Sequence, residues 1–228
     1  MLDADELIRR MRSFPANYMQ DFNEFWRYKL AVESGRGHIL DEDHVRRTYY
    51  LLADVLVKWQ AFRPRPLNRC LYLLEKALIN ISGAYDEIRK YDLLHFRDVP
   101  VEPLELIWHE LGMVKSLGAR SPHGRYFIIS VCKPLMLLWG QTPAFDARVR
   151  ENLPPRYHVS KTNRKWSFWE WRSVMMRIQR DLALSPGFLR TAREEAKRMY
   201  GADFTVPYGR FLDIYFWVGP HGRSVRPP

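Results

Sequence analysis

The chain has 228 residues, of which 46% are hydrophobic and 27% charged, and its formal net charge is +10. This composition is typical of a globular protein and excludes an intrinsically disordered chain. The longest apolar run, from Pro134 to Trp139, is too short to span a bilayer, and the acidic start of the sequence is unlike a signal peptide. We therefore expect a cytoplasmic protein that does not enter a membrane. Its basic charge favours a polyanionic partner.

No linker-like segment divides the sequence. We therefore expect one compact domain over 1–228, with a loose tail at about 219–228. The two cysteines, Cys70 and Cys132, form no CxxC motif, and the seven histidines show no metal-ligand spacing. Both thiols are expected to be buried and reduced, and neither a metal nor another cofactor is expected.

Apolar residues recur at helical spacing along nearly the whole chain. No segment alternates convincingly with a period of two, so the fold class is expected to be all-α. Asp41 is a good N-cap for the helix that follows Ser34-Gly-Arg-Gly37. The main expected helices cover 1–33 with a break at Phe14-Pro15, 41–62, 66–81, 85–94, 104–117, 125–139, a helix from 165, 188–200 and 207–217.

The segment 130–150 has the most unusual pattern. An apolar helix carries Lys133 in its middle, stops at Gly140, and is followed by a short turn that leads to Asp146 at the start of a basic helix. Asp146 stands where an N-cap belongs, so it has a structural interpretation as well as a chemical one. Lys133 is bracketed by apolar residues and has the alternative interpretation of a lysine whose amine reaches solvent along an apolar stem.

A strongly basic region follows Asp146. From Ala147 to Arg180 there are nine Lys or Arg residues and two Glu residues, a net charge of +7. Aromatic residues are interleaved with the cations, a pattern that suits contact with phosphates and an unstacked base. A solvated helix face is the alternative. The candidate nucleic-acid contacts here are Lys161, Arg164, Lys165, Trp166, Trp169 and Arg172.

Several of these features together resemble a known superfamily. They are a helix, a connection from Gly118 to Gly124, a helix with Ser130-x-x-Lys133, and then Pro143-x-x-Asp146-x-x-Val149. This order resembles a divergent bacterial branch of the helix-hairpin-helix DNA glycosylases, and the segment 210–217 is similar to the closing helix of that branch. The resemblance implies a helix-hairpin-helix DNA glycosylase-like helical bundle.

The resemblance also implies roles for single residues. Asp146 would be the catalytic carboxylate, which stabilises the positive charge that develops on the deoxyribose and orients the attacking water. Lys133 is the candidate for a Schiff-base nucleophile, but it lies nine residues past Gly124 rather than directly after it, which favours a monofunctional enzyme with Lys133 in a supporting role. Arg120, His123 and Arg125 would approach the DNA backbone at the hairpin. The iron-sulfur cysteines of some relatives are absent.

The function that follows is that of a DNA N-glycosylase, which flips a base out of double-stranded DNA and leaves an abasic site. The target base is not written in the sequence. A hypermodified base of phage DNA, such as glucosylated hydroxymethylcytosine, would place the protein in antiviral defence.

Two alternatives remain open. Arg89 and His95 have the Arg-x5-His spacing that resembles the ribonuclease motif of the all-helical HEPN domains. In that case these two residues, and not Asp146, would be essential. The third hypothesis is a non-catalytic DNA-binding protein, whose binding would depend strongly on salt and leave every substrate intact.

Overall fold

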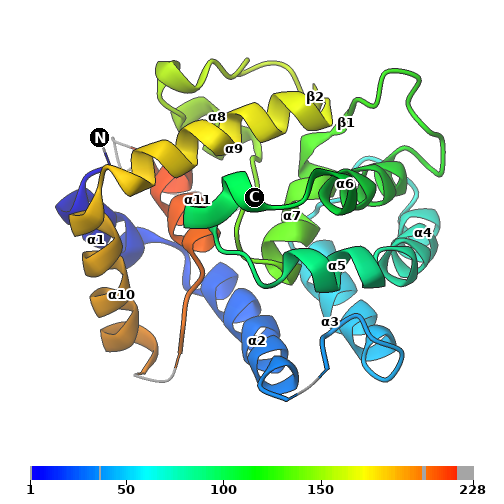
Figure 1. Cartoon of the computed structure of the whole chain (residues 1–228), viewed down its shortest axis with the longest axis horizontal. Helices are drawn as coiled ribbons and strands as arrows, with labels where there is room; N and C mark the ends of the chain where they lie inside the picture. Colours follow the sequence, from blue (N-terminus) through cyan, green and yellow to red (C-terminus); the bar gives the residue numbers. More distant parts are fainter. Residues whose placement is uncertain (1, 36, 202–203, 220–228) are drawn as a thin grey trace.

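The structure is a computed structural model that describes residues 2–35, 37–201 and 204–219. It confirms the all-α fold class, because the described chain is almost entirely helices and connections (Figure 1). Within these residues the sheet is limited to β1 (Tyr126–Phe127) and β2 (Lys165–Trp166), which pair antiparallel with Tyr126 opposite Trp166. The tail expected at 219–228 lies, apart from Gly219, outside the described residues.

Eleven α-helices lie within the described ranges. They are α1 (Ala4–Ser13), α2 (Ala16–Glu33), α3 (Val45–Lys58), α4 (Leu67–Asn80), α5 (Ser82–Ile88), α6 (Val101–Lys115), α7 (Ile128–Leu138), α8 (Ala147–Asn152), α9 (Phe168–Ala183), α10 (Pro186–Tyr200) and α11 (Tyr208–Val218). Two short 3₁₀ helices, η1 (Leu93–Asp98) and η2 (Pro155–Tyr157), complete the order.

Several helix boundaries differ from expectation. Helices α5, α6 and α10 begin two or three residues earlier than expected, and the helix expected over 85–94 ends at Ile88 and is followed by η1. Three other starts differ for a local reason. Asp41 does not cap α3, because its carboxylate accepts the main-chain N–H groups of His38 and His44 and closes the turn before the helix. The helix expected from residue 125 begins at Ile128, since β1 takes residues 126–127. Similarly, β2 takes residues 165–166, and Ser167 caps α9 in a capping box with Glu170.

The connection between α6 and α7 depends on close packing and on glycine. Gly118 and Gly124 both have positive φ, of 86° and 60°, which glycine adopts without steric cost. Gly112 of α6 lies against Tyr126, whose ring atoms would be 2.3 Å from any added Cβ. A larger residue at position 112 would therefore push β1 away from α6.

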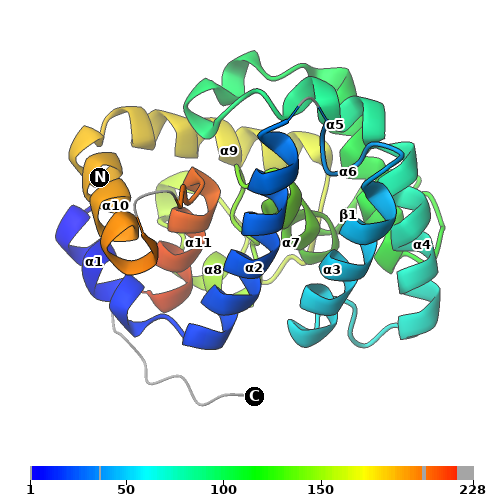
Figure 2. The same cartoon turned by 90° about the horizontal axis from the view of Figure 1, so that it is seen from below.

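Helix α7 lies inside the molecule, with nearly all of its side chains buried. Figure 2 shows α11 between α1 and α10 on one side and α2 on the other, with α8 beside it. The start of α11 meets the end of α7 at two glycines, where the Gly209 N–H donates to the Gly140 carbonyl at 2.9 Å. A Cβ on Gly209 would lie 2.4 Å from the Thr142 nitrogen, so only glycine lets α11 approach this closely.

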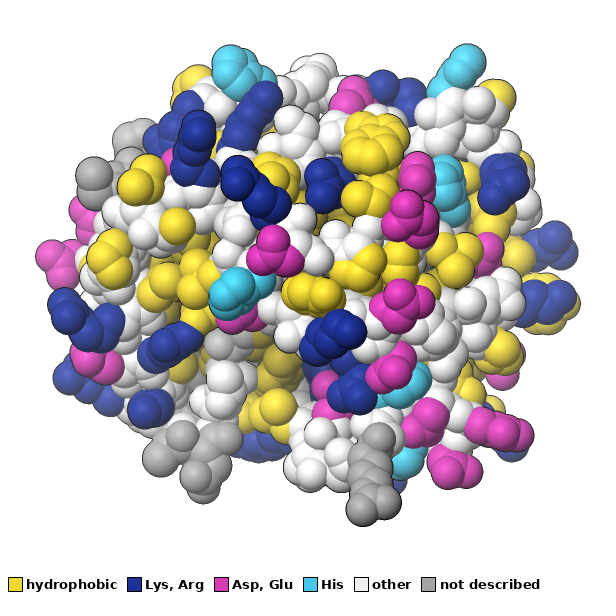
Figure 3. Space-filling view, in the orientation of Figure 1, with side chains coloured by type: hydrophobic (Ala, Val, Ile, Leu, Met, Phe, Trp, Pro, Cys, Tyr) yellow, Lys and Arg dark blue, Asp and Glu magenta, His cyan; other side chains and the backbone are white. Residues whose placement is uncertain are grey.

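No helix in the described part of the chain combines the length and hydrophobicity needed to cross a membrane. Cys70 and Cys132 are both buried and free, as expected. On the face in Figure 3, Lys and Arg side chains gather over the left part of α9 and the connection above it. Acidic side chains gather at the lower right of the same face.

Candidate active site

The structure brings Lys133 and Asp146 into one small pocket, together with residues from both ends of the chain. The pocket has a cavity volume of about 40 Å³. Four aromatic side chains and four charged ones line it, with Ala144 between them. They are Phe14, Tyr18, Trp59, Trp217, Lys133, Asp146, Arg210, Asp213 and Ala144.

Lys133 projects from α7 and is only 7% exposed. Its Nζ donates to the Trp59 carbonyl at 2.8 Å and lies 5.8 Å from the centre of the Trp59 ring. The amine therefore points into the protein, and the interpretation of a lysine reaching solvent is wrong. Burial lowers the pKa of Lys133, while the carboxylates of Asp146 and Asp213 act in the opposite direction.

Asp146 is half-buried and serves as the N-cap of α8, where its Oδ1 accepts the Val149 N–H at 3.0 Å. A capping carboxylate uses one oxygen for the helix and has another that can face a ligand. The structural and the chemical interpretations of Asp146 are therefore compatible. The residue before it, Phe145, has a positive φ of 50°, and this turns the chain sharply into the helix.

Helix α11 adds an ion pair to the pocket. Arg210 Nη1 lies 2.8 Å from Asp213 Oδ2, and both side chains are almost fully buried. The other Asp213 oxygen accepts the Ala144 N–H at 2.9 Å. Because Ala144 lies two residues before Asp146, Asp213 holds the segment that carries Asp146.

Burial raises the pKa of Asp213 to about 6. The positive charge of Arg210 opposes this rise, and the negative charge of Asp146 adds to it. A carboxyl group with such a pKa is in part protonated near neutral pH. A perturbed carboxyl beside a second carboxylate and a buried amine is a frequent feature of catalytic sites.

Aromatic rings form the walls. Arg210 lies between the rings of Phe14 and Phe22, at 4.8 and 4.7 Å from their centres. At the side of Asp146, the Arg148 guanidinium lies 4.3 Å from the centre of the Trp217 ring. Aromatic walls around a carboxylate suit the stabilisation of a positive charge that develops beside it.

The candidate DNA-binding residues lie in several environments. Arg120 and His123 are exposed in the connection between α6 and α7, and Lys161, Arg164 and Lys165 are exposed before α9. Trp169 is 56% exposed. Arg125 pairs with Glu170 at 2.9 Å and donates to the Lys165 carbonyl, so it fastens the connection to β2. Arg172 is half-buried.

Trp166 requires a correction. Its side chain is only 4% exposed, its ring packs on Phe145 at 5.3 Å, and its indole N–H donates to the Asn163 carbonyl. The ring therefore supports the segment before Asp146 and presents no face to an unstacked base. The β1–β2 pairing that places Tyr126 opposite Trp166 is the reason for this burial.

Much of the basic excess has a structural use. The buried Arg150 donates to the carbonyls of Phe145, Lys161 and Asn163, at 3.2, 3.0 and 2.8 Å. It therefore ties the segment before Asp146 to the exposed basic segment before β2. Arg156 pairs with Asp181 at 2.6 Å.

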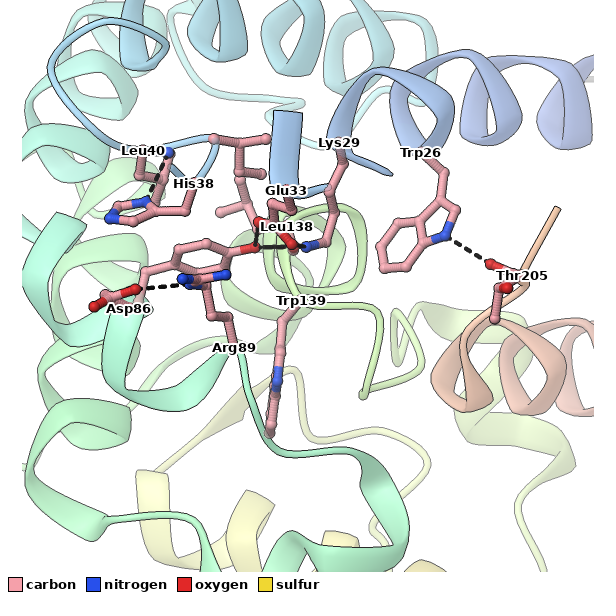
Figure 4. Close-up of polar contacts among 12 residues, drawn as sticks. Trp26, Lys29, Glu33, His38, Leu40, Asp86, Arg89, Leu138, Trp139 and Thr205 are labelled. Carbon is pink, nitrogen blue, oxygen red and sulfur yellow. Dashed lines mark hydrogen bonds and ion pairs between the residues drawn. The ribbon is translucent and has the colours of Figure 1, made fainter. Parts of the chain in front are cut away.

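A second buried polar cluster lies at the far end of α7. Lys29 pairs with Glu33 and donates to the Tyr85 hydroxyl at 2.8 Å, and that hydroxyl lies 2.8 Å from the Leu138 carbonyl (Figure 4). Burial lowers the pKa of Lys29 and raises the pKa of Tyr85. The cluster fixes the end of α7, from which the chain leads toward Asp146.

Arg89 lies beside this cluster, where it pairs with Asp86 at 2.7 Å (Figure 4). The ring of His95 contacts Asp92 at 2.8 Å. Within the described residues the contacts of Arg89 and His95 do not join the two side chains to each other. Each residue is engaged by a neighbour in sequence, an arrangement that lends the ribonuclease alternative no support.

Reasoning from the sequence missed Trp59, Tyr18, Arg210 and Asp213. The sequence does contain a signal for Arg210 and Asp213, since these two charged residues stand three positions apart in an otherwise apolar helix. Such a pair in a buried helix indicates an internal ion pair. The aromatic walls had no such signal, because aromatic residues at helical spacing usually form the core.

A second, more open hollow of about 250 Å³ lies between the 158–163 segment and α9. Its rim includes His158, Glu170 and Arg177. Glu170 is already used by the Ser167 cap and by Arg125, and Arg177 donates to the Tyr157 carbonyl. These two charged groups on the rim of the hollow are therefore engaged by neighbouring residues.

The chain matches no protein-family model, no curated protein and no solved structure.

Proposed function

We propose that the protein is a DNA N-glycosylase, with Asp146 as the catalytic carboxylate and a helix-hairpin-helix glycosylase-like arrangement of α6, α7 and α8. The observation that carries the proposal is the meeting of Asp146, Lys133 and four aromatic rings in one pocket. Helix α6, a connection with two glycines at positive φ, helix α7 with its lysine, and Asp146 at the start of α8 occur in the order of that superfamily.

The proposed reaction uses these groups as follows. The rings that line the pocket pack on one another with centres 5.1 to 6.3 Å apart, so a base that leaves the duplex would stack on them only after they move apart. As the bond from C1′ to the base nitrogen breaks, its electron pair leaves with the base and the sugar becomes cationic. The Asp146 carboxylate stabilises this charge. A water oxygen then bonds to C1′ and the water proton passes to Asp146. The base takes up a proton from solvent, and Asp146 returns its proton to solvent.

Lys133 and Asp213 have supporting roles in this scheme. The Lys133 amine donates to the Trp59 carbonyl, so it holds an aromatic wall of the pocket. Asp213 positions the segment that carries Asp146. We propose a monofunctional enzyme that leaves the strand intact at the abasic site.

The decisive experiment counts abasic sites with an aldehyde-reactive probe. The native protein and the Asp146→Asn variant are incubated with plain genomic DNA and with phage DNA that carries glucosylated hydroxymethylcytosine. Asparagine is as good an N-cap as aspartate, so this variant keeps α8 and removes only the charge. We expect abasic sites from the native protein at a rate at least about 100-fold above that of the variant.

Activity on the modified DNA alone would support a role in antiviral defence, and infection of cells that express either protein would test that role. Equal numbers of abasic sites with native and variant protein would refute Asp146 as the catalytic group. Borohydride trapping tests the monofunctional proposal, since a Schiff base at Lys133 would leave a covalent complex that Lys133→Met abolishes.

A non-catalytic DNA-binding protein is the second candidate. The observation in its favour is that Lys161, Arg164 and Lys165 are exposed and form no ion pair within the described residues. Retained DNA binding without abasic sites on any DNA would favour this candidate. RNA cleavage that depends on Arg89 and His95 would favour the ribonuclease.

A further inference from the structure

Three cations surround the half-buried ring of Phe127. Lys165 Nζ lies 4.9 Å from the ring centre, Lys115 Nζ 5.5 Å and Arg65 Cζ 5.8 Å. They come from three places in the chain: β2, the last turn of α6 and the connection between α3 and α4. The β1–β2 pairing sets Phe127 opposite Lys165 and so brings this cation to the ring. We call these four residues, with Arg164 beside Lys165, the Phe127 cluster.

The cluster lacks counter-charges. Over the described ranges, none of its four cations forms an ion pair with an aspartate or a glutamate. The neighbouring Arg125, by contrast, pairs with Glu170. Of the four, Lys115 is buried, whereas Arg65, Arg164 and Lys165 are exposed. A ligand can therefore reach the cluster from solvent.

Like charges at this place repel one another. Burial, followed by the positive charges of Lys133, Arg65 and Arg164, lowers the pKa of Lys115 to about 8, while Cys70 acts in the opposite direction. An anion bound among these cations would relieve that repulsion. Arginine and lysine together supply the N–H groups that phosphate oxygens accept.

The cluster and the pocket share one turn of the chain. Lys133 donates to the Trp59 carbonyl from the side of the pocket, and Lys115 donates to the Ala61 carbonyl at 3.0 Å from the side of the cluster. Trp59 itself lines the pocket. An anion at the cluster would therefore lie next to whatever enters the pocket.

We propose that the Phe127 cluster binds a backbone phosphate of the DNA strand whose base enters the pocket. The proposal rests on the proposed function for its partner, because it is a phosphate of duplex DNA that the cluster holds. Arg65, Arg164 and Lys165 contact the phosphate oxygens. The buried Lys115 adds a positive charge that attracts the phosphate without contacting it. The Phe127 ring offers an apolar surface to the adjoining deoxyribose.

The test compares two double variants. Arg65→Ala with Lys165→Ala removes two exposed cations from the cluster. Arg46→Ala with Lys76→Ala is the matched control, because it removes an exposed arginine and an exposed lysine that also lie over aromatic rings, 6.0 Å from the centre of Tyr50 and 4.6 Å from that of Tyr72. All four side chains are exposed, so both proteins are expected to fold, and thermal unfolding checks this.

Binding to a fluorescent DNA duplex is measured by anisotropy between about 50 and 200 mM salt. We expect the cluster variant to bind about tenfold more weakly, and its plot of log affinity against log salt to lose about one to two units of slope. The control is expected to keep the native slope. Equal slopes for the two variants would overturn the proposal, and so would loss of inorganic phosphate binding without a change in DNA binding.

The binding result can be separated from the test of the proposed function, because DNA binding is measured without any catalysis. If the native protein makes abasic sites and the cluster variant binds DNA normally, phosphate binding by the Phe127 cluster is refuted and the proposed glycosylase function stands. If the cluster variant has a reduced salt slope and the native protein makes no abasic sites, phosphate binding by the Phe127 cluster is supported and the proposed glycosylase function is refuted.

Discussion

The Asp213 carboxylate accepts the main-chain N–H of Ala144 at 2.9 Å, two residues before Asp146. A side chain from the last described helix thereby fixes the segment that carries the proposed catalytic residue. The same carboxylate pairs with the buried Arg210, so the two oxygens of Asp213 have separate partners.

This relationship predicts an order of activity among variants. Asp213→Asn keeps an oxygen for the Ala144 N–H but loses the charge that pairs with Arg210, whereas Asp213→Ala loses both. We expect a drop in the rate of abasic-site formation of about tenfold for Asn and about 100-fold for Ala, since small displacements of a catalytic group have effects of this size. A merely structural role would lower stability without shifting the pH profile of the reaction, so both are measured.

Asp213 also gives a stability prediction with a definite sign. Its pKa is about 6 in the native protein against an ordinary value of 3.8, so the native state binds the proton more tightly than the unfolded state. The contribution of Asp213 to the free energy of unfolding therefore falls as pH rises from about 4 to 6, by about 3 kcal/mol in total. Urea unfolding of native protein and Asp213→Asn across this range measures the difference. A difference that is constant with pH would contradict the raised pKa.

Gly209 is expected to tolerate no side chain. The Cβ of Gly209→Ala would meet the main chain at Thr142 and Gly140, which cannot move without shifting the end of α7. We expect a loss of about 3 kcal/mol in the free energy of unfolding, the cost of overpacking a rigid site. Gly187→Ala is the control, because nothing lies within 4 Å of its added Cβ and α10 favours alanine, so it should leave stability unchanged or raise it by up to about 1 kcal/mol. Similar losses for both variants would refute the close approach.

The affinity for DNA should depend on pH through Lys115. Its pKa of about 8 reflects burial and the nearby charges of Lys133, Arg65 and Arg164, with Cys70 opposing them. A phosphate bound nearby favours the charged amine, so binding takes up a proton near pH 8 and is expected to weaken as pH rises from about 7 to 9. In Lys115→Met this part of the pH dependence should vanish. Anisotropy titrations at several pH values measure it, and an unchanged profile in the variant would contradict the role of Lys115.

Hydrophobic periodicity in the sequence was sufficient to predict the all-α class and most helices. It failed at helix starts that tertiary pairing decides, such as Ile128 and Phe168, where two short strands compete with the helix for residues 126–127 and 165–166. The prediction that Asp41 caps the following helix was wrong for a local reason, because its carboxylate accepts two main-chain N–H groups within the preceding turn.

The candidate site was predictable only in part. Lys133 and Asp146 stand out because each interrupts an apolar or a basic pattern, and the structure places them in one pocket. Their companions from α11 depend on the contact between Gly140 and Gly209, which joins residues far apart in the sequence and has no local signature. Trp166 shows the opposite error, since a tryptophan among cations indicated an exposed platform and is instead buried against Phe145.

The lining of the pocket runs from Phe14 to Trp217 and so draws on nearly the whole described chain. During synthesis, a ribosome-bound chain that has emerged only as far as α10 already contains Lys133 and Asp146 but lacks Arg210, Asp213 and Trp217. It therefore has a lysine and an aspartate without the wall and the ion pair that orient them. Under the proposed function, activity at this pocket is expected only once α11 has docked, and a proteolytic cut that releases α11 is expected to end it.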